Sequence, residues 1–574
     1  MKTPTSRARL AVSAAVTAGL CLAGTAALAT PSQAATGTCD TAFPTANLVR
    51  DQLVTGKTVS QGTTPGDFNG KIIGVLQDGI EPGVDMVVAE LHSTDIDSAG
   101  IWAGMSGSPV YAQNGDLIGA VSYTLSWGET QVAGITPWED MQKYAGQLQP
   151  PAHVAVSDSM ARQIANRTDV TTAQAAQGFH ELRAPALVAG VSQRVLDQAA
   201  GQRKYLGGDA SAAGTAPVSP GPSDIVAGGN LVATMATGDI TIGGLGTVTS
   251  VCNNHVVGFG HPMNFLGKTT YGLAGADTLY IQPDSLGGSY KVANIGDLLG
   301  TIDQDRGLGI SGDLGPIPDQ TAISSTVNYT PDGGTLQTHI GTSDVQFADA
   351  AAETAFYQLV TNHQYVLDAY QPGSESQSWT VTGHTVDGPF TLEGSNLYTD
   401  TFDITYGSAW DVPDLLWLLS RINGVTIDSV DVTSDVNDST DRLHIKGMEQ
   451  RRGGAWVTVD KEHPALAHAG KRLTLRLLFQ AGQNGHKFSF DIPAKAAGMR
   501  ARMYTYGAAS YPFERNRPHT LAGVQKLVDN MTRNDQARVY IYGYGEKTSF
   551  HQTATTPSEG KVIAGHGRFK VKIS

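Results

Sequence analysis

Short apolar segments that alternate with polar residues and are separated by glycine-containing turns dominate this chain. In residues 45–145 these segments recur at short intervals, with Asn-Gly or Asp-Gly pairs between several of them. Short apolar runs bounded by turn residues are typical of strands, and these dipeptides favour tight hairpin turns. We therefore predict consecutive strands at Lys71–Leu76, Met86–Leu91, Pro109–Ala112, Leu117–Tyr123 and Gln131–Ile135.

Two further regions carry the same strand signal, and helical spacing appears between and after them. Short Val, Ile and Thr runs fill residues from about 231 to 315, and residues 425–500 alternate like the strands of a β-sandwich. A proline-broken run of small residues at 207–224 predicts a surface loop or linker. Helical spacing marks Pro137–Gly146, Val156–Arg167 (with Ser157 or Asp158 as N-cap), Ala350–Ala369 and Asp411–Ile422. The fold class expected is mainly β.

These patterns divide the chain into domains. We predict a signal peptide at 1–34, a first domain at 35–320, an α+β accessory region at 321–424, a β-sandwich at 425–505 and a C-terminal α/β tail at 506–574. Within the first domain we expect a strand region at 45–150, a helical or linker region at 151–225 and a second strand region at 226–320.

The N-terminus has the pattern of a secretory signal. Lys2, Arg7 and Arg9 form a basic start, an Ala-rich apolar run covers Leu10–Ala29, and Ser32-Gln33-Ala34 offers a small-x-small cleavage site. Cleavage after Ala34 is favoured over an uncleaved anchor, because serine, threonine and glycine dilute the apolar run. No later segment is apolar enough to span a bilayer. We expect an exported product, secreted or at the cell surface, without a transmembrane segment.

Composition adds two expectations. Cleavage leaves two of the three cysteines, Cys39 and Cys252, and in an oxidising compartment these predict one disulfide bond, the alternative being two unpaired thiols. Cleavage also takes the formal net charge from −14 to about −17, because it removes three basic residues and no acidic one. So acidic a chain argues against long-range attraction to nucleic acid or to an anionic membrane.

The stretch Gly104–Pro109 (Gly-Met-Ser-Gly-Ser-Pro) sets a serine between glycines in a tight turn before a strand pair. Small residues let the backbone fold so that the N–H groups of Gly104 and Ser106 converge on one point. An oxyanion hole, the site that binds the negatively charged oxygen of an acyl-transfer intermediate, needs such a pair of donors. The turn therefore predicts a nucleophilic Ser106. The alternative is an ordinary hairpin with a glycine-rich entry.

A serine nucleophile needs a base within hydrogen-bond reach, and His261 is the best candidate among the 15 histidines. His261 follows a strand of alternating apolar and glycine residues, and Pro262 then bends the chain out of that strand. Both features would present the imidazole at a strand end. There are two alternatives. His255, in a polar turn nearby, is a weaker candidate for the base, or His261 merely bonds a loop carbonyl and is no base.

Several separated motifs together resemble the SpoIVB-type serine peptidases over roughly residues 50–315. They are Gly104–Pro109 with its strand pair, Val132–Met141, Gly246–Thr249, Val257–Pro262 and Asp303–Ile310. The resemblance implies a trypsin-like double β-barrel peptidase, with a Ser barrel at 45–150 and a His barrel at 226–320. It also implies Ser106 as nucleophile and His261 as base. The serine segment comes first here, unlike in the sporulation enzyme, and we expect no PDZ-like module or membrane anchor, so the chain looks like the longer exported relatives.

The third member of a triad has two open assignments. The family's aspartate lies shortly before the serine motif, which corresponds to Asp95 (or Asp97) here. A chymotrypsin-like arrangement places the acid downstream of the histidine instead, which corresponds to Asp305 (or Asp303). A serine–histidine dyad without an acid is a further alternative.

Other chemistries lack their signatures. The sequence contains no His-Glu-x-x-His, Cys-x-x-Cys, P-loop or dinucleotide fingerprint, so we expect no cofactor and no metal. We interpret the tail tyrosines as ordinary strand packing rather than a glycan- or wall-binding face; they are Tyr504, Tyr506, Tyr511, Tyr540, Tyr542 and Tyr544. The function predicted is an exported serine endopeptidase acting on a protein or peptide, with association with the cell wall or surface as a lesser expectation. The alternative is a non-catalytic secreted binding protein that keeps the scaffold.

Overall fold

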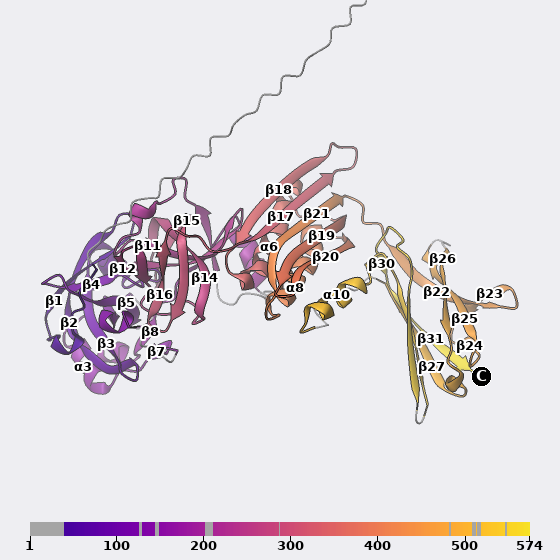
Figure 1. Ribbon diagram of the computed structural model, residues 1–574, viewed down its shortest axis with the longest axis horizontal. Helices are drawn as coiled ribbons and strands as arrows, with labels where there is room; N and C mark the ends of the chain where they lie inside the picture. The colour runs from indigo at the N-terminus through magenta and orange to yellow at the C-terminus, as the bar shows by residue number, and fades with distance from the viewer. Residues whose placement is uncertain are drawn as a thin grey trace, which may run out of the picture. The chain divides into compact units, whose positions relative to one another are not determined.

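The computed structural model describes residues 39–125, 129–143, 149–200, 210–285, 287–480, 484–507, 513, 518–545 and 548–574 (Figure 1). The expected signal segment at 1–34 lies outside these residues. Among the described residues, no helix has the length and apolar character needed to cross a membrane.

The first part of the chain forms an antiparallel sheet that closes on itself. Its strands are β1 (Leu53–Thr58), β2 (Gly66–Glu81), β3 (Val84–His92), β4 (Pro109–Ala112), β5 (Leu117–Leu125), β6 (Val132–Pro137), β7 (His153–Val154) and β8 (Phe179–Glu181). The order is β4-β1-β2-β3-β6-β5-β8-β7, and β4 also pairs with β5. Strands β1–β6 therefore make a closed six-stranded barrel, and one apolar cluster takes side chains from all six. The five strands predicted from short apolar runs within residues 71–135 are confirmed as parts of β2 to β6.

A second ring of six antiparallel strands follows in sequence. The thirteen-stranded sheet contains β9 (Ala186–Ala189), β10 (Ala210–Thr215), β11 (Asn230–Gly238), β12 (Thr241–Cys252), β13 (His255–Gly258), β14 (Gly267–Gln282), β15 (Tyr290–Arg306), β16 (Gly309–Leu314), β17 (Thr321–Thr330), β18 (Gln337–Val345), β19 (Gly373–Thr385), β20 (Gly388–Asp400) and β21 (Thr426–Asn437). Pairings run β11-β12-β13-β16-β15-β14 and return to β11.

One correction concerns the linker expected at 207–224. Residues 210–215 form β10, which pairs in parallel with β9 and β15, so its described part joins the sheet. Its alanine, serine and glycine side chains show no apolar–polar alternation, which is why the pattern does not reveal a strand.

The sheet continues beyond the ring, because β11 also pairs with β18. Helix α6 (Ala351–Leu367) packs on β17, β18 and α8 (Asp411–Ser420). Strand β21 pairs with β17 and β19. Strand β21 was expected to be the first strand of the β-sandwich at 425–505. It belongs instead to the thirteen-stranded sheet.

Residues 443–574 form two five-stranded sheets around a shared apolar core. Their strands are β22 (Leu443–Arg452), β23 (Ala455–Val459), β24 (Ala465–Ala467), β25 (Arg472–Phe479), β26 (Asn484–Asp491), β27 (Arg500–Tyr506), β28 (Arg538–Tyr544), β29 (Ser549–Thr555), β30 (Ile563–Ala564) and β31 (His566–Ile573). The tail expected at 506–574 therefore supplies strands to this sandwich.

The remaining helices are short and lie between strands. They are α1 (Thr94–Ala99), α2 (Trp138–Met141), α3 (Asp158–Ala165), α4 (Thr172–Ala175), α5 (Gln193–Ala200), α7 (Ile404–Ser408) and α10 (Leu521–Asp529), with 3-10 turns at Thr45–Asn47, Pro222–Asp224, Ala348–Ala350 and Ala494–Ala496. Ser157 caps α3 through its hydroxyl, as one of the two predicted N-caps.

Candidate functional site

The turn that carries Ser106 lies between α1 and β4 and is fixed to the barrel by its backbone. Gly104 and Gly107 have φ angles of +93° and +98°, a region in which a side chain is strained. The Gly107 N–H donates to the Val121 carbonyl (2.8 Å), and the Val121 N–H donates to the Ser108 carbonyl (3.0 Å). These two bonds hold the turn against β5.

Two backbone donors of this turn have no acceptor. The N–H groups of Met105, Gly107 and Ser108 are bonded within the barrel, whereas in the described part of the chain those of Gly104 and Ser106 donate to nothing. The Ser106 hydroxyl, fully buried, likewise has no partner among these residues. Buried backbone donors are rarely left unpaired. The two donors predicted for an oxyanion hole are therefore the two in this turn that have no acceptor among the described residues.

His261 follows β13 on a strained segment. Phe259 has a φ of +69°, uncommon for a residue with a side chain. The imidazole is buried, and its Nδ1 lies 2.7 Å from the Pro262 carbonyl oxygen. Because a carbonyl can only accept, Nδ1 carries the proton and Nε2 holds a lone pair. Nε2 has no hydrogen-bond partner among the described residues.

Thr247 on β12 connects the serine turn to the histidine segment. Its N–H donates to the Ser106 carbonyl (2.8 Å), and its carbonyl accepts from the Phe259 N–H (3.3 Å). Its hydroxyl donates to the Gly104 carbonyl (3.0 Å). One residue of the second ring thus bonds both segments.

A second connection runs from the histidine segment to the first barrel. The Thr136 hydroxyl donates to the Gly260 carbonyl (2.7 Å) and shares a hydrogen bond with the Ser122 hydroxyl (2.7 Å). A methyl group at Gly260 would lie 2.4 Å from the Ser122 oxygen. The structure therefore brings the serine and histidine segments to the same stretch of β5. It does not join the two side chains by a hydrogen bond, since Ser106 Oγ and His261 Nε2 are both unpaired.

Asp305 organises the loop after His261. It is fully buried on β15, and its carboxylate accepts from the N–H groups of Met263 (2.8 Å), Asn264 (2.8 Å) and Leu266 (3.4 Å). Asp305 therefore fixes the loop that leaves the imidazole, and it makes no hydrogen bond or ion pair with His261 within the described residues.

The other sequence candidates lie elsewhere. Asp95 is exposed in the first turn of α1 and has no bond to His261 in the ranges that the structure describes. Asp97 bonds the His92 imidazole (2.7 Å), and Asp303 is exposed on β15. His255 pairs with Asp313 across two strands (3.0 Å).

Glu181 is an acid near the imidazole that the sequence analysis missed. Its carboxylate lies 3.8 Å from His261 Nδ1 and is largely buried at the end of β8. Burial raises the pKa of Glu181, and the neighbouring imidazole acts in the opposite direction. At 3.8 Å the Glu181 carboxylate is beyond hydrogen-bond distance of Nδ1, which is bonded to the Pro262 carbonyl instead. A three-residue strand carries no motif that points to Glu181.

Lys291 is the second residue that sequence reasoning missed. It is fully buried on β15, and a methyl group at Gly104 would lie 3.0 Å from its Cβ. Its Nζ donates to the Asn230 side-chain oxygen (2.9 Å). Burial lowers the pKa of Lys291 from 10.5 to about 7. A signal was present, because Lys291 takes an inward position in an alternating strand that continues with Ala293 and Ile295.

The predicted disulfide is confirmed. Cys39 and Cys252 are bonded, which ties the start of the described chain to the end of β12. Beside it, the Ser250 hydroxyl donates to Asp40 Oδ2 (2.5 Å), and burial raises the pKa of Asp40.

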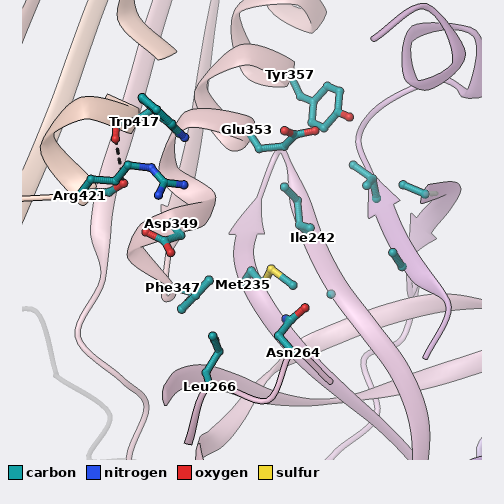
Figure 2. Close-up of a pocket in the computed structure, with 15 residues that line it drawn as sticks. Met235, Ile242, Asn264, Leu266, Phe347, Asp349, Glu353, Tyr357, Trp417 and Arg421 are labelled. Carbon is teal, nitrogen blue, oxygen red and sulfur yellow. Dashed lines mark hydrogen bonds between the residues drawn. The ribbon is translucent and has the colours of Figure 1, made fainter. Parts of the chain in front are cut away.

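A cavity of about 220 Å³ borders the loop that Asp305 holds. Figure 2 shows Glu353 and Tyr357 entering it from α6 above Met235 and Ile242. The other lining residues are Ala186, Val188, Ala210, Gly243, Asn264, Leu266, Phe347, Asp349, Trp417, Ser420 and Arg421. Apolar walls with a few polar groups are typical of ligand pockets. No group of metal-binding side chains occurs among the described residues.

Comparison of the chain with models of protein families, with curated proteins and with solved structures found no match. The functional argument therefore depends on the geometry of the Ser106 turn and the His261 segment.

Proposed function

We propose that this protein is an exported serine endopeptidase with a trypsin-like pair of barrels, of the SpoIVB type. The observation that carries the proposal is the set of unpaired groups at one turn. The Ser106 hydroxyl and the Gly104 and Ser106 N–H groups lack partners in the described chain, and the His261 segment is bonded to the same Thr247. A nucleophile, two oxyanion donors and a base are the parts that acyl transfer requires.

The proposed reaction uses these groups in order. As Ser106 Oγ attacks the peptide carbonyl carbon, His261 Nε2 takes the hydroxyl proton. The carbonyl oxygen becomes negatively charged and binds the N–H groups of Gly104 and Ser106. The tetrahedral intermediate then expels the amine, which takes the proton from His261, and leaves an acyl-enzyme that water hydrolyses by the same steps.

The acid of this reaction is assigned by proximity. Glu181 lies 3.8 Å from His261 Nδ1, and the Pro262 carbonyl accepts the proton on that nitrogen. Together they orient the ring and stabilise its charged form. Asp305 acts as a positioning residue through the loop that it holds.

Burial favours the second candidate function, a binding protein that retains this scaffold. The side chains of Ser106 and His261 are 0% and 1% exposed and are not bonded to each other. A peptidase would have to admit the substrate by moving one ring relative to the other, whereas a binding protein would need no opening.

Fluorophosphonate labelling of the full mature chain tests the proposal. Wild type should be labelled, and Ser106→Ala and His261→Ala should not. His255→Ala is a matched control for His261→Ala and should keep the label, since His255 pairs with Asp313 on the surface (3.0 Å). Cleavage of a fluorogenic casein by wild type alone would then establish peptidase activity. A folded wild type that takes no label would favour the binding protein.

A further inference from the structure

In the C-terminal sandwich, the sheet formed by β24, β31, β27, β28 and β29 has one buried face and one exposed face. Along β27, the side chains of Ala501, Met503 and Thr505 are buried, while the positions between them are exposed or half-buried. Strands β28 and β31 alternate in the same way, and β29 nearly so. The strand registers bring the outward positions of the four strands side by side.

We call this outward surface the tyrosine–arginine face. Across β31, β27, β28 and β29 its four rows are Lys572, Arg500, Tyr544, Ser549; Lys570, Arg502, Tyr542, His551; Arg568, Tyr504, Tyr540, Thr553; and His566, Tyr506, Arg538, Thr555. The tyrosines interpreted from sequence as strand packing therefore point outward, apart from Tyr511, which lies outside the described residues.

The charge of this face is opposite to that of the chain. The chain has 53 acidic and 39 basic residues, yet none of the positions on the face is acidic. Six of them are permanent cations: Arg500, Arg502, Arg538, Arg568, Lys570 and Lys572. None of the six forms an ion pair within the described residues, although Arg472, Arg476 and Lys561 of the same sandwich do. Unpaired cations at this density repel one another, and an anionic partner would relieve that repulsion.

The tyrosines form a rigid stack between these cations. The rings of Tyr504 and Tyr540 lie 5.0 Å apart and those of Tyr506 and Tyr540 lie 5.8 Å apart, nearly parallel in both pairs. The Arg568 guanidinium lies 5.6 Å from the Tyr504 ring centre. The stacked rings cover part of one another's faces, and the Tyr506 and Tyr540 hydroxyls share a hydrogen bond of 3.4 Å at the surface.

We infer that the tyrosine–arginine face binds an acidic polysaccharide whose sugars carry carboxylates. Arginine forks pair with carboxylates through two parallel hydrogen bonds, and tyrosine hydroxyls bond sugar hydroxyls. Neighbouring rows, which are two residues apart along each strand, are spaced by about 6.7 Å and neighbouring strands by about 4.8 Å, so these side chains recur at intervals of the order of one sugar unit in an extended chain. Single-stranded nucleic acid fits less well, because its bases need free aromatic faces for stacking.

Binding of the full mature chain to polygalacturonate tests this inference, with neutral dextran and a thymidine oligonucleotide as comparison probes. Polygalacturonate should bind, more tightly than either probe and less tightly as salt rises. Equal binding to dextran, or tighter binding to the oligonucleotide, would overturn the inference.

A charge reversal locates the site. Arg502→Glu with Lys570→Glu should weaken polygalacturonate binding at least about tenfold, because charge-assisted hydrogen bonds are lost. The control, Lys461→Glu with Lys495→Glu, makes the same change in net charge at exposed positions off the face and should bind as wild type. A milder Arg502→Gln, Lys570→Gln pair serves if the reversal unfolds. Equal binding by the face and control variants would refute the site. Ser106→Ala should bind normally, since the inference is independent of the proposed peptidase.

Discussion

Gly107→Ala perturbs the closest backbone approach between the serine turn and the second ring. A methyl group at Gly107 would lie 1.9 Å from the Thr247 oxygen and 2.5 Å from the Phe259 nitrogen. Gly115→Ala is a matched control, because Gly115 has a similar φ of +87° but nothing within 4 Å of the added carbon. Both variants carry the strain of a side chain at positive φ, about 1–2 kcal/mol.

The difference in the free energy of unfolding between these two variants therefore measures the cost of the close contact at Gly107. Overpacking costs about 1–3 kcal/mol, and each hydrogen bond that Thr247 loses costs roughly 0.5–1.5 kcal/mol. With both of its backbone bonds lost, Gly107→Ala should be less stable than Gly115→Ala by about 2–6 kcal/mol. The transition that unfolds the two rings should therefore have a lower melting temperature in Gly107→Ala, by a few degrees.

Thermal melts followed by circular dichroism, with fluorophosphonate labelling below the transition, make the comparison. Gly107→Ala should lose the label, because displacement of β12 moves the His261 segment away from the serine turn. Gly115→Ala should keep it. Equal melting temperatures and equal labelling of the two variants would refute the close approach on which the site depends.

Three further predictions concern the surroundings of the site. Lys291→Met should stabilise the protein at pH 7. Between pH 7 and 10.5 the Lys291 amine binds a proton in the unfolded chain but not in the folded one, so the stability of wild type should rise with pH. The stability of Lys291→Met should lack this rise. A difference in melting temperature between wild type and Lys291→Met that does not change with pH would contradict the burial argument. Cys252→Ser should lose about 2–5 kcal/mol, because the disulfide closes a separation of 213 residues, and reductant should lower the melting temperature of wild type but not of the variant; an identical response would count against the bond. Asp305→Asn should lose roughly 1–3 kcal/mol and the serine label, because one amide oxygen cannot serve three donors; the exposed control Asp303→Asn should be neutral, and a similar loss there would refute the role of Asp305.

Local sequence patterns predicted most of these strands and helices, but they did not predict which other elements pack against them. The strands from β2 to β6 follow from short apolar runs and from turn dipeptides such as Asn114-Gly115, and β5 and β6 are buried at every position. Helix α6 shows the limit of such a pattern, because it was predicted as amphipathic and is buried on nearly every side. Hydrophobic periodicity identifies the face of α6 that packs on the sheet. It does not reveal that α8, from a later part of the chain, packs on this helix as well.

The same limit applies to the candidate site. Glycine-rich turns marked Ser106 and a strand end marked His261, because those conformations leave a local signature. Glu181 leaves no motif and Lys291 only its place in an alternating strand, because pairings between distant strands bring Glu181 near His261 and Lys291 near the serine turn. The open choice between Asp95 and Asp305 had the same cause: spacing along the chain does not reveal which carboxylate points at the imidazole.

The hydrogen bonds between the two rings join residues that are far apart in the sequence, so the site forms only when both rings are present. The Thr247 hydroxyl and the Gly104 carbonyl are 143 positions apart, and Thr136 and Gly260 are 124 apart. A chain that emerges N-terminus first presents the serine turn long before β12 and the His261 segment are made. The proposed reaction at Ser106 therefore requires that both rings have been made and have folded.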